Sequence, residues 1–343
     1  MIKVAKNQSL KHLNTLALDA VAAWYVTFDD PPADLTELWR EGCFNSDFVV
    51  LGHGANVLFT GDFDGIVLHP NRQFIKRMSE CEDGLVEVVV GSGMLWDDVI
   101  ERVLDMGLCG CENLSGIPAD MGGAVVQNIG AYGMEISAIV ESVFAFDVTT
   151  GKFHDIPASE CAFGYRTSAF KRRDNKLIIT DVLLRLPKCD DQWQPNLSYA
   201  GLRSYCEENQ QYLASPKTIR EAVINIRNSK LPDPAVEPNA GSFFKNPIVD
   251  KALADSLLAQ YPEMPHWAVD TPGKVKLSGG WLIEKSGWKG RNLGPVGIHH
   301  CSALVVVNNG GGTNKDILRL VEAVTADVFA RFGVQLEPEV LFI

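Results

Sequence analysis

The sequence feature that most constrains this chain is a glycine-dense stretch over residues 116–133, which holds five glycines among apolar and amide-bearing residues. A flexible linker would be rich in serine and hydrophilic. Glycines in such a stretch let the backbone come close to a flat ring or a diphosphate, because no Cβ intervenes. The stretch therefore favours a ligand-binding loop of a folded domain, with a purely structural loop as the alternative.

A second glycine loop, Gly52–Val57, directly follows the apolar run Phe48–Leu51. It does not match the dinucleotide fingerprint GxGxxG, because its sixth residue is Val57 and no capped helix opens after it. Taken alone, this loop is equally well explained as a tight surface turn. Together, the two loops could clamp one extended cofactor.

Charge and composition exclude some classes of protein. The chain has 343 residues, with 31 Lys and Arg against 43 Asp and Glu, a net charge of −12, which argues against nucleic-acid binding. A hydrophobic fraction of 46% and this length predict two or three globular domains with a sizeable core. An anionic substrate would need a local cluster of cations, because the overall field repels it.

Other classes are disfavoured by what the sequence lacks. It has no apolar run of about 18 residues and no basic-then-apolar start, so we expect a cytoplasmic protein without membrane insertion. Its eight cysteines are scattered without CxxC pairs, which predicts reduced, mostly buried thiols. We assign no metal site to His299 and His300, because adjacent side chains usually point apart and no third ligand is evident.

Hydrophobic patterning predicts a mixed α+β protein. In the first half it indicates a short helix around Leu35–Trp39, strands at Phe48–Leu51, Ile66–Leu68, Val86–Val90, Val143–Val148 and Leu177–Leu186, and a helical stripe over Trp96–Leu104. Beyond them it indicates a helix opened by Ser215 and Pro216, a domain junction at Leu231–Pro238, helices near 250–260 and 281–284, a strand at Ala303–Val307, a helix over Ile317–Val328 ended by Gly333, and a last strand at Val334–Phe342.

Three further segments carry chemically useful residues: Gly164–Phe170, Asn239–Pro247 and Leu336–Val340. With the two glycine loops, they resemble the motifs of the UDP-N-acetylenolpyruvoylglucosamine reductase family, flavoenzymes that make UDP-N-acetylmuramate for peptidoglycan. The resemblance extends from Asn14 to Glu339, with all motifs in the family's order.

The resemblance implies an α+β fold in which a two-subdomain FAD-binding region of the vanillyl-alcohol-oxidase-like (PCMH) type precedes a C-terminal α+β substrate-binding domain. We expect subdomain 1 at residues 1–78, completed by 333–343, subdomain 2 at 79–226, and the substrate-binding domain at 227–332. A monomer is expected.

The implied reaction is NADPH-dependent reduction of UDP-N-acetylglucosamine enolpyruvate to UDP-N-acetylmuramate through non-covalent FAD, with hydride delivered to C3. Ser242 matches the family's proton donor to C2. Arg166 and Glu339 match the residues that stabilise the charge developing on the substrate carboxylate. Glu339 can donate a hydrogen bond there only in its protonated form.

The resemblance also assigns binding residues. For the cofactor these are Gly52, His53, Gly54, Ala55, Asn56, Val57, Gly116, Ile117, Pro118, Gly122, Gly123, Ala124, Asn128, Gly130, Ala131, Tyr132 and Gly133, and for the substrate Tyr199, Lys230 and Asn246. A half-buried packing role is an equal alternative for Tyr199. Arg166, Arg227, Lys230 and Lys245 would supply the local positive charge.

Two departures from the family pattern bear on affinity. Ala55 stands where the family usually has Ser or Thr, so a hydroxyl that could bond the flavin diphosphate is missing and weaker flavin retention is expected. The chain ends Val340–Ile343 without the family's usual arginine.

Two alternatives remain at this point. One is another FAD-dependent oxidase or dehydrogenase of the same flavin fold, which could tether its flavin through a histidine such as His53. The other is a binding module without turnover, against which the presence of Arg166, Ser242 and Glu339 argues. Because no separate NADPH fingerprint is present, NADPH would share the substrate's pocket, and ping-pong kinetics follow.

Overall fold

The computed structural model describes residues 2–172 and 176–343. The chain divides into two compact units. Unit 1 contains the chain up to Gln8, Ala22–His53 and Phe63–Ser229, and unit 2 contains Ser9–Val21, Gly54–Asp62 and Lys230–Ile343. The three-part division expected from the sequence stays a prediction.

The first sheet of unit 1 has the strand order β1-β2-β5-β3, formed by Lys3–Ser9, Val21–Phe28, Phe63–Pro70 and Phe48–Val50. β5 pairs in parallel with both β2 and β3, which requires crossover connections. Helix α1 (Pro31–Arg40) lies in the first crossover and buries Leu35 and Leu38 in the core that contains Phe28. The amphipathic pattern around Leu35 therefore marks a helix docked on a sheet.

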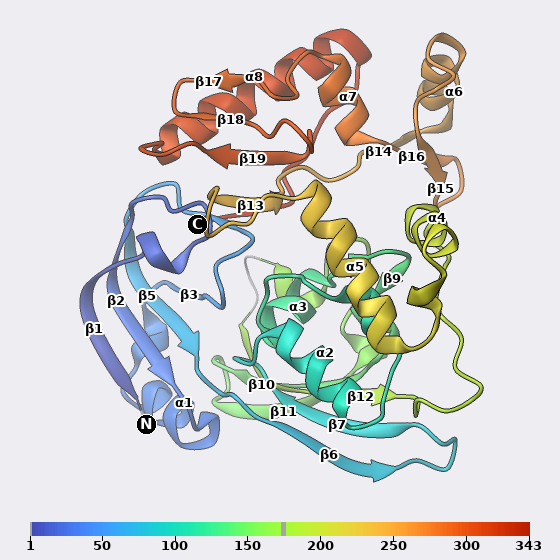
Figure 1. The fold of residues 1–343 in the computed structure, drawn as a ribbon. Coiled ribbons are helices and arrows are strands. Elements are labelled where there is room, and N and C mark those ends of the chain that lie inside the picture. The colour runs from blue at the N-terminus through green and yellow to red at the C-terminus, as the bar shows by residue number, and fades with distance from the viewer. Residues whose placement is uncertain (1, 173–175) are drawn as a thin grey trace. The chain divides into compact units, whose positions relative to one another are not determined.

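The second sheet of unit 1 has the order β11-β10-β12-β7-β6, formed by Lys152–Pro157, Val140–Asp147, Leu177–Leu186, Val86–Gly91 and Ile75–Glu80. Helices α2 (Trp96–Asp105) and α3 (Met121–Gln127) lie over one face of this sheet (Figure 1). Trp96 is fully buried in the shared core and donates its indole N–H to the Leu114 carbonyl at 3.0 Å.

Two helices close the unit 1 part of the chain. α4 (Ala200–Glu208) and α5 (Pro216–Lys230) share a small core that includes Leu202, Ile219 and Val223. Ser215 Oγ accepts from the Thr218 N–H at 3.3 Å, as expected for a residue that opens a helix. α5 ends at Lys230, before Pro232, because proline cannot continue the hydrogen-bond ladder.

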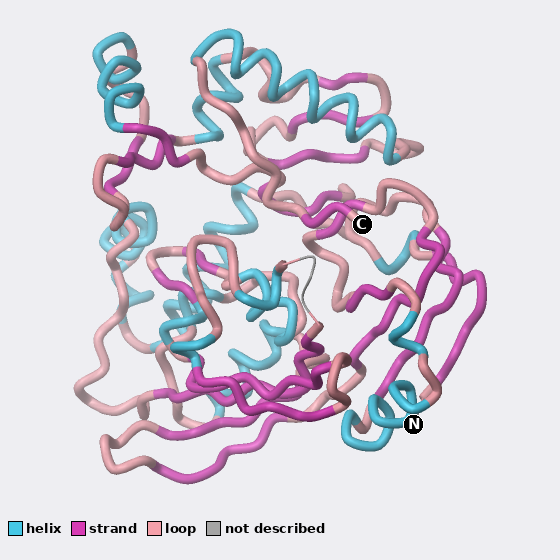
Figure 2. The backbone as a smooth tube through the Cα atoms, turned by 180° about the vertical axis from the view of Figure 1, so that it is seen from behind, coloured by secondary structure: helices cyan, strands magenta, loops and turns pink. Residues whose placement is uncertain are grey.

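Unit 2 contains a sheet of order β13-β19-β18-β17, formed by Asn239–Ser242, Val305–Asn308, Val296–Ile298 and Asn292–Leu293. The long helix α8 (Asn314–Phe332) runs beside it (Figure 2) and buries its apolar face in the same core. α8 begins with a capping box between Thr313 and Asp316 and ends at Gly333, whose φ of 66° suits glycine.

The remainder of unit 2 is built from short elements. A small sheet β14-β16-β15 (Ile248–Asp250, Lys274–Leu277, His266–Ala268) is accompanied by α6 (Lys251–Gln260) and α7 (Gly279–Lys285). β4 (Val57–Leu58) pairs in parallel with β20 (Leu341–Phe342), which joins the end of the chain to the first glycine loop. β8 (Gly130–Ala131) and β9 (Met134–Glu135) form a small hairpin in unit 1.

The expected last strand over Val334–Phe342 is wrong except at its end, since only Leu341–Phe342 forms a strand. Pro338 has no N–H to donate to a strand ladder. The neighbouring groups bond instead to the segment after β13: Lys245 donates its N–H to the Glu337 carbonyl at 2.9 Å, and Glu339 donates to the Phe243 carbonyl at 2.8 Å.

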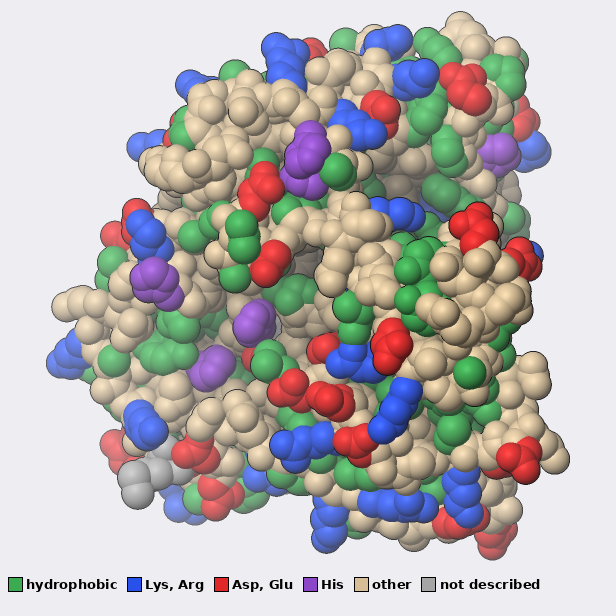
Figure 3. Space-filling model, viewed as in Figure 1, with side chains coloured by type: hydrophobic (Ala, Val, Ile, Leu, Met, Phe, Trp, Pro, Cys, Tyr) green, Lys and Arg blue, Asp and Glu red, His purple; other side chains and the backbone are tan. Residues whose placement is uncertain are grey.

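On the face drawn in Figure 3, basic and acidic side chains are interspersed, with no extended basic patch. Ion pairs of this kind include Lys217 with Asp105 at 2.7 Å. Among the described residues no helix has the length and apolar character needed to cross a membrane.

Candidate functional site

Arg166 lies at the tip of a tight hairpin in unit 1. Gly164 and Thr167 exchange backbone hydrogen bonds at 3.0 and 3.1 Å, and this closes the turn around Tyr165 and Arg166. Arg166 has φ 56°, the left-handed region that costs a residue with a Cβ about 1–2 kcal/mol. Its guanidinium donates to the Gly130 carbonyl at 2.6 Å, so the second glycine loop fixes the side chain of the hairpin.

Asn128 connects this hairpin to the glycine loop. Its side-chain NH₂ donates to the Gly164 carbonyl at 3.0 Å and to Glu135 Oε2 at 2.9 Å, while its oxygen accepts from the Ser137 N–H at 3.1 Å. Asn128 is buried and, like Tyr132, holds a positive φ. Non-glycine residues in this conformation persist only where the surrounding structure offsets their strain, and they are frequent at functional sites.

A second guanidinium, that of Arg227, lies against the start of the same loop. Its Nε donates to the Gly116 carbonyl at 3.1 Å. Burial lowers the pKa of Arg227, and repulsion from Arg166 acts in the same direction. Because Arg166 and Arg227 repel each other, an anion bound near both would relieve the repulsion. Of the four cations expected from the sequence, Arg166 and Arg227 interact within unit 1, whereas Lys230 and Lys245 belong to unit 2.

The residues of the second loop that the sequence assigns to the cofactor lie within and around α3. Ile117 and Pro118 lead into the helix, Gly122, Gly123 and Ala124 occupy its first turns, and Gly130–Gly133 follow it. The loop expected here from the sequence is wrong for Met121–Gln127, which forms a helix because Met121, Ala124 and Val125 pack into the core. Gly123 is exposed, and a Cβ there would meet no atom within 4 Å, so bare backbone faces open space at this turn.

Asp120 is a residue that sequence reasoning missed. It precedes α3 and is 4% exposed, and its carboxyl lies so close to Gly52 that a Cβ on Gly52 would be 2.7 Å from Oδ2. Burial raises the pKa of Asp120 to about 7. Among the described residues no donor or cation pairs with this carboxyl. The available signal was an acidic residue between two glycine-rich segments.

The first glycine loop is divided between the units. Gly52 and His53 belong to unit 1, where burial followed by the charge of His69 lowers the pKa of His53. Gly54–Val57 belong to unit 2. Gly54 has φ 69°, and a Cβ there would be 2.0 Å from the Leu13 carbonyl. Its lack of a side chain is therefore explained by packing within unit 2.

Ser242 is positioned in unit 2 by a bulge at the end of β13. The β13–β19 register shifts between Asn239 and Ser242, and Gly241 in the bulge has φ 64°. Buried Asn239 holds the bulge, since its Oδ1 accepts from the Gly241 N–H at 2.8 Å. Phe243 and Phe244, both fully buried, then anchor the chain. A bulge of this kind re-aims a side chain next to a site.

Glu339 lies beside the Ser242 segment. Besides the 2.8 Å bond from the Glu339 N–H to the Phe243 carbonyl, Phe244 and Pro338 form an isolated bridge. Asn56 of the first glycine loop donates to the Glu339 carbonyl at 3.4 Å. The structure therefore brings Ser242, Glu339 and Asn56, which are remote in sequence, into neighbouring segments of unit 2. Arg166 belongs to unit 1.

Tyr199 is 42% exposed and contacts the second glycine loop within unit 1. Its ring meets that of Tyr132 edge-on, with centroids 5.4 Å apart. The preceding Ser198 Oγ donates to the Gly133 carbonyl at 3.4 Å, and Asn113 donates to the carbonyls of both Tyr132 and Asn196 at 2.8 Å. The Tyr199 segment is thus fastened to the loop assigned to the cofactor.

Lys230 and Asn246, the two other residues that the sequence assigns to the substrate, differ in their surroundings. Lys230 is exposed at the end of α5. Asn246 is half-buried, and its oxygen accepts from the Gly279 N–H at 2.9 Å, which fixes the start of α7. Asn246 therefore has a structural role, and its NH₂ group is what it can offer to a ligand. Lys245 pairs with Glu337 at 3.6 Å.

The residues of unit 1 fit the flavin nucleotide that the sequence motifs imply. Arg227 offers positive charge beside the start of the glycine loop, and Gly123 offers bare backbone next to open space. These are the features that a flat, diphosphate-bearing anion requires. Asp120 is the exception, since its ionised carboxylate would repel a diphosphate.

Comparisons with known proteins agree with this assignment. Residues 233–343 match the family model for the UDP-N-acetylenolpyruvoylglucosamine reductase C-terminal domain, and residues 30–156 match the model for an FAD binding domain. The reductase of Dechloromonas aromatica (strain RCB) is 42% identical, and the alignment covers 98% of each chain. The reductase of Bacteroides fragilis (strain YCH46) is 40% identical, again over 98% of each chain.

A solved structure has the same fold. The crystal structure of UDP-N-acetylenolpyruvylglucosamine reductase from Thermus caldophilus superimposes with a TM-score of 0.67 at 24% identity, covering 100% of this chain and 98% of that one. The expected α+β class, an FAD-binding region followed by a C-terminal domain, is confirmed. The chain therefore belongs to the UDP-N-acetylenolpyruvoylglucosamine reductase family.

Proposed function

We propose that this protein reduces UDP-N-acetylglucosamine enolpyruvate to UDP-N-acetylmuramate with electrons from NADPH. It is an FAD-binding oxidoreductase of peptidoglycan synthesis, as its family membership indicates. The observation that carries the proposal is the backbone pairing in unit 2 that sets the Glu339 segment beside Ser242. These two side chains are the kinds that a reduced alkene needs next to its carboxylate: a proton donor and a hydrogen-bond donor.

When bound, FAD accepts a hydride from NADPH and passes it to the substrate. The groups that would hold its diphosphate are the bare backbone around Gly123 and the Arg227 cation. The protein supplies position and charge rather than redox chemistry. Tyr132 and Tyr199 would cover a bound ligand with their edge-on ring pair.

Arg166 is assigned to the substrate carboxylate. As electron density moves from the alkene toward that carboxylate, a guanidinium can hold both oxygens in a bidentate pair. The hairpin geometry supports this role, because the bond to the Gly130 carbonyl orients the guanidinium before substrate arrives. An arginine that is already oriented loses less rotational freedom on binding.

Ser242 is assigned as the proton donor to C2. A serine hydroxyl is a weak acid, so it must act with partners that stabilise its alkoxide or relay a proton. The bulge at Gly241 supports the role by fixing the serine backbone, and Glu339 supports it by lying on the adjoining segment. Glu339 is assigned as the hydrogen-bond donor to the substrate carboxylate.

The test uses the purified, flavin-loaded protein under anaerobic conditions. NADPH should bleach the yellow flavin, and UDP-N-acetylglucosamine enolpyruvate should then restore the colour while UDP-N-acetylmuramate forms. Protein that is bleached but recoloured only by oxygen would contradict the reductase proposal and indicate an oxidase. Steady-state lines for NADPH and sugar nucleotide should run parallel, because both substrates would use the same pocket in turn.

A further inference from the structure

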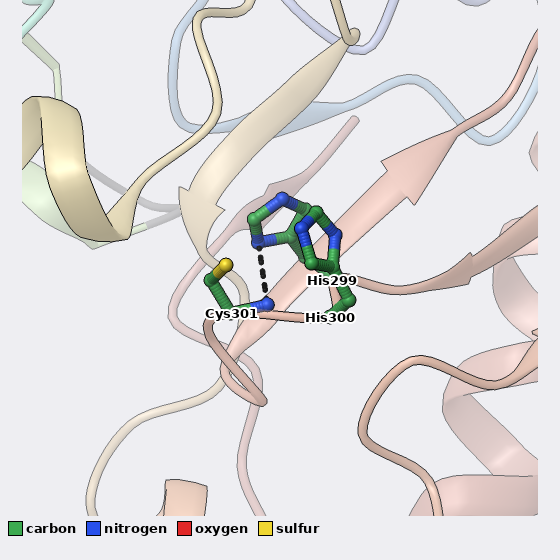
Figure 4. Close-up of side chains that lie close together, drawn as sticks. All are labelled: His299, His300 and Cys301. Carbon is green, nitrogen blue, oxygen red and sulfur yellow. Dashed lines mark hydrogen bonds between the residues drawn. The ribbon is translucent and has the colours of Figure 1, made fainter.

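Three consecutive residues after β18 gather atoms that can bind a metal ion. His299, His300 and Cys301 each offer one ligand atom, and these atoms lie within 4.8 Å of one another (Figure 4). The two imidazole rings have centroids 4.3 Å apart and are tilted by 56°. The sequence-based expectation that the two histidines point apart without a third ligand is therefore wrong.

The backbone conformation explains why these adjacent side chains do not point to opposite sides, as they would in a strand. The chain turns back between β18 and β19, since the His299 N–H donates to the Val305 carbonyl at 2.9 Å and the Val305 N–H donates to the Ser302 carbonyl at 3.1 Å. Residues in a turn do not follow the two-residue period of a strand. His299 itself is 6% exposed, so its ring is held in place, whereas His300 and Cys301 are exposed.

Two contacts of His299 fix which ring nitrogen is free of a proton. The Cys301 N–H donates to His299 Nδ1 at 3.3 Å, so Nδ1 carries the lone pair. The proton is then on Nε2, which lies 3.6 Å from Glu237 Oε2. A carboxylate that faces the second ring nitrogen of a histidine is common around protein-bound metals, because once hydrogen-bonded it fixes the tautomer and raises the basicity of the ligand nitrogen.

We propose that His299 Nδ1, a ring nitrogen of His300 and the Cys301 thiolate bind one divalent cation of the zinc class. Nitrogen and sulfur ligands select such borderline-soft ions over Mg²⁺ and Ca²⁺, which prefer oxygen. Three protein ligands leave the fourth tetrahedral position open to water. All the residues concerned, including Glu237, lie in unit 2.

Binding of the cation requires no reactant other than solvent. Cys301 loses its thiol proton to solvent, the sulfur binds the cation, and the weak 3.3 Å hydrogen bond to His299 Nδ1 is replaced by a metal–nitrogen bond. In a tetrahedral zinc site neighbouring ligand atoms are about 3.5 Å apart. The exposed side chains of His300 and Cys301 can rotate to close the remaining separation.

The loop also shares backbone bonds with the strand of Ser242. Val305, which accepts from the His299 N–H, is the register partner of Ser242, and the Phe243 N–H donates to the Leu304 carbonyl at 2.7 Å. The cation site is therefore a neighbour of the Ser242 segment within unit 2. Binding itself does not depend on the function proposed above.

The experiment titrates Zn²⁺ into the reduced, flavin-loaded full chain by calorimetry, with Co²⁺ difference spectra to detect a metal–thiolate bond. One cation per chain is expected, with release of one proton and a thiolate-to-cobalt charge-transfer band. Cys301→Ser should abolish that band, and Cys301→Ser and His300→Ala should each weaken Zn²⁺ binding at least tenfold. Glu237→Gln should weaken it by about 10–100-fold, the effect usual for such supporting groups.

Matched controls come from the surface of unit 1. Cys189 and His154 are exposed and lie outside the cluster, so Cys189→Ser and His154→Ala should leave affinity and stoichiometry unchanged. Binding that survives in both Cys301→Ser and His300→Ala would overturn the proposal, as would the absence of saturable Zn²⁺ binding by the unchanged protein. Both cluster variants alter exposed side chains, so loss of folding is not expected to confuse the result.

Discussion

The two regions that carry the assigned catalytic residues hold them by different means. In unit 1, side chains hold the site: Asn128 bonds three backbone or carboxylate partners, and the Arg166 guanidinium bonds Gly130. In unit 2, main-chain bonds join the Ser242 and Glu339 segments at Phe243 and Lys245, and one side chain, that of Asn239, holds the bulge before Ser242.

This difference has a consequence for mutation. In unit 1, a side-chain substitution around Arg166 changes the local structure as well as the reaction, because side chains hold the site together there. Replacing the side chain of Ser242 or Glu339 leaves the backbone pairing intact, so chemistry should change without loss of the fold. Unit 2 is therefore the better place to separate catalysis from stability.

The largest effect is expected for Ser242→Ala. Loss of a general acid typically reduces the rate of a step by about 10²–10⁴-fold. Anaerobic stopped-flow should show slow flavin reoxidation by the enolpyruvyl substrate, while flavin reduction by NADPH keeps its rate. Ser256→Ala, an exposed serine on α6 of the same unit, is the control. Equal slowing of both half-reactions would contradict the assignment.

Arg166→Lys is the corresponding change in unit 1. It keeps the charge but removes the planar guanidinium, whose parallel N–H groups can bind both oxygens of a carboxylate. Complete loss of an electrostatic donor costs about 10²–10³-fold, so we expect this charge-conserving change to lower kcat/KM for the sugar nucleotide by at least about tenfold and by less than complete loss would. Arg203→Lys, an exposed arginine on α4, should have no such effect. A loss of less than tenfold would remove Arg166 from the chemistry.

Asn128 tests the claim that side chains support unit 1. Asn128→Ala leaves buried partners unsatisfied at a cost of about 1–3 kcal/mol and places alanine at φ 46°. Asn128→Gly removes the same hydrogen bonds but tolerates that φ, so its thermal unfolding midpoint should lie between those of Asn128→Ala and the unchanged protein. Exposed Asn228→Ala on α5 is the control. Identical midpoints for the two Asn128 variants would show that backbone strain contributes nothing.

Asp120 makes the stability of unit 1 depend on pH. Its pKa rises from 3.8 to about 7 on folding, so between these pH values the folded state binds more protons than the unfolded state. The stabilisation is present in acid and is lost as pH rises through about 7. A pKa that differs by one between the folded and unfolded states corresponds to about 1.4 kcal/mol. Asp120→Asn should therefore be more stable than the unchanged protein by at least that amount at pH 8 and by little at pH 4.

Thermal unfolding at both pH values measures this difference, and titration of FAD into the flavin-free protein adds a second measurement. Asp120→Asn should also bind FAD more tightly at pH 8, because no carboxylate repels the diphosphate. Asp155→Asn, an exposed change in the same unit, is the control. A stability difference that does not vary with pH would show that Asp120 is ionised in the folded protein throughout this range.

Sequence reasoning succeeded where the signal was local. Leu177–Leu186 and the stripe from Trp96 match a strand and a helix of the structure, because burial on one face leaves a regular period. It failed where pairing is long-range. The Val334–Phe342 segment looks like a strand, but its hydrogen bonds go to residues near Phe243, which no local pattern reveals.

The candidate site shows the same contrast between local sequence signals and long-range contacts. The motifs that carry Arg166, Ser242 and Glu339 were identified by resemblance, and the neighbourhood of Ser242 and Glu339 came only from the structure. Asp120 could not be singled out from the sequence, because a single acidic residue becomes informative only when its burial is known. The cluster at His299 was missed for a related reason, since a turn replaces the strand period there.

The smallest expected effect concerns Ala55, which lies in unit 2 on the loop next to Asn56. Ala55→Ser restores a hydroxyl, and one neutral hydrogen bond to a flavin diphosphate contributes about 0.5–1.5 kcal/mol, which is a two- to twelvefold gain in affinity. Fluorescence titration of FAD into the flavin-free protein measures it. Thr60→Ser is the control, because it keeps a hydroxyl elsewhere in the same segment. Unchanged affinity in Ala55→Ser would mean that a hydroxyl at this position makes no hydrogen bond to the flavin diphosphate.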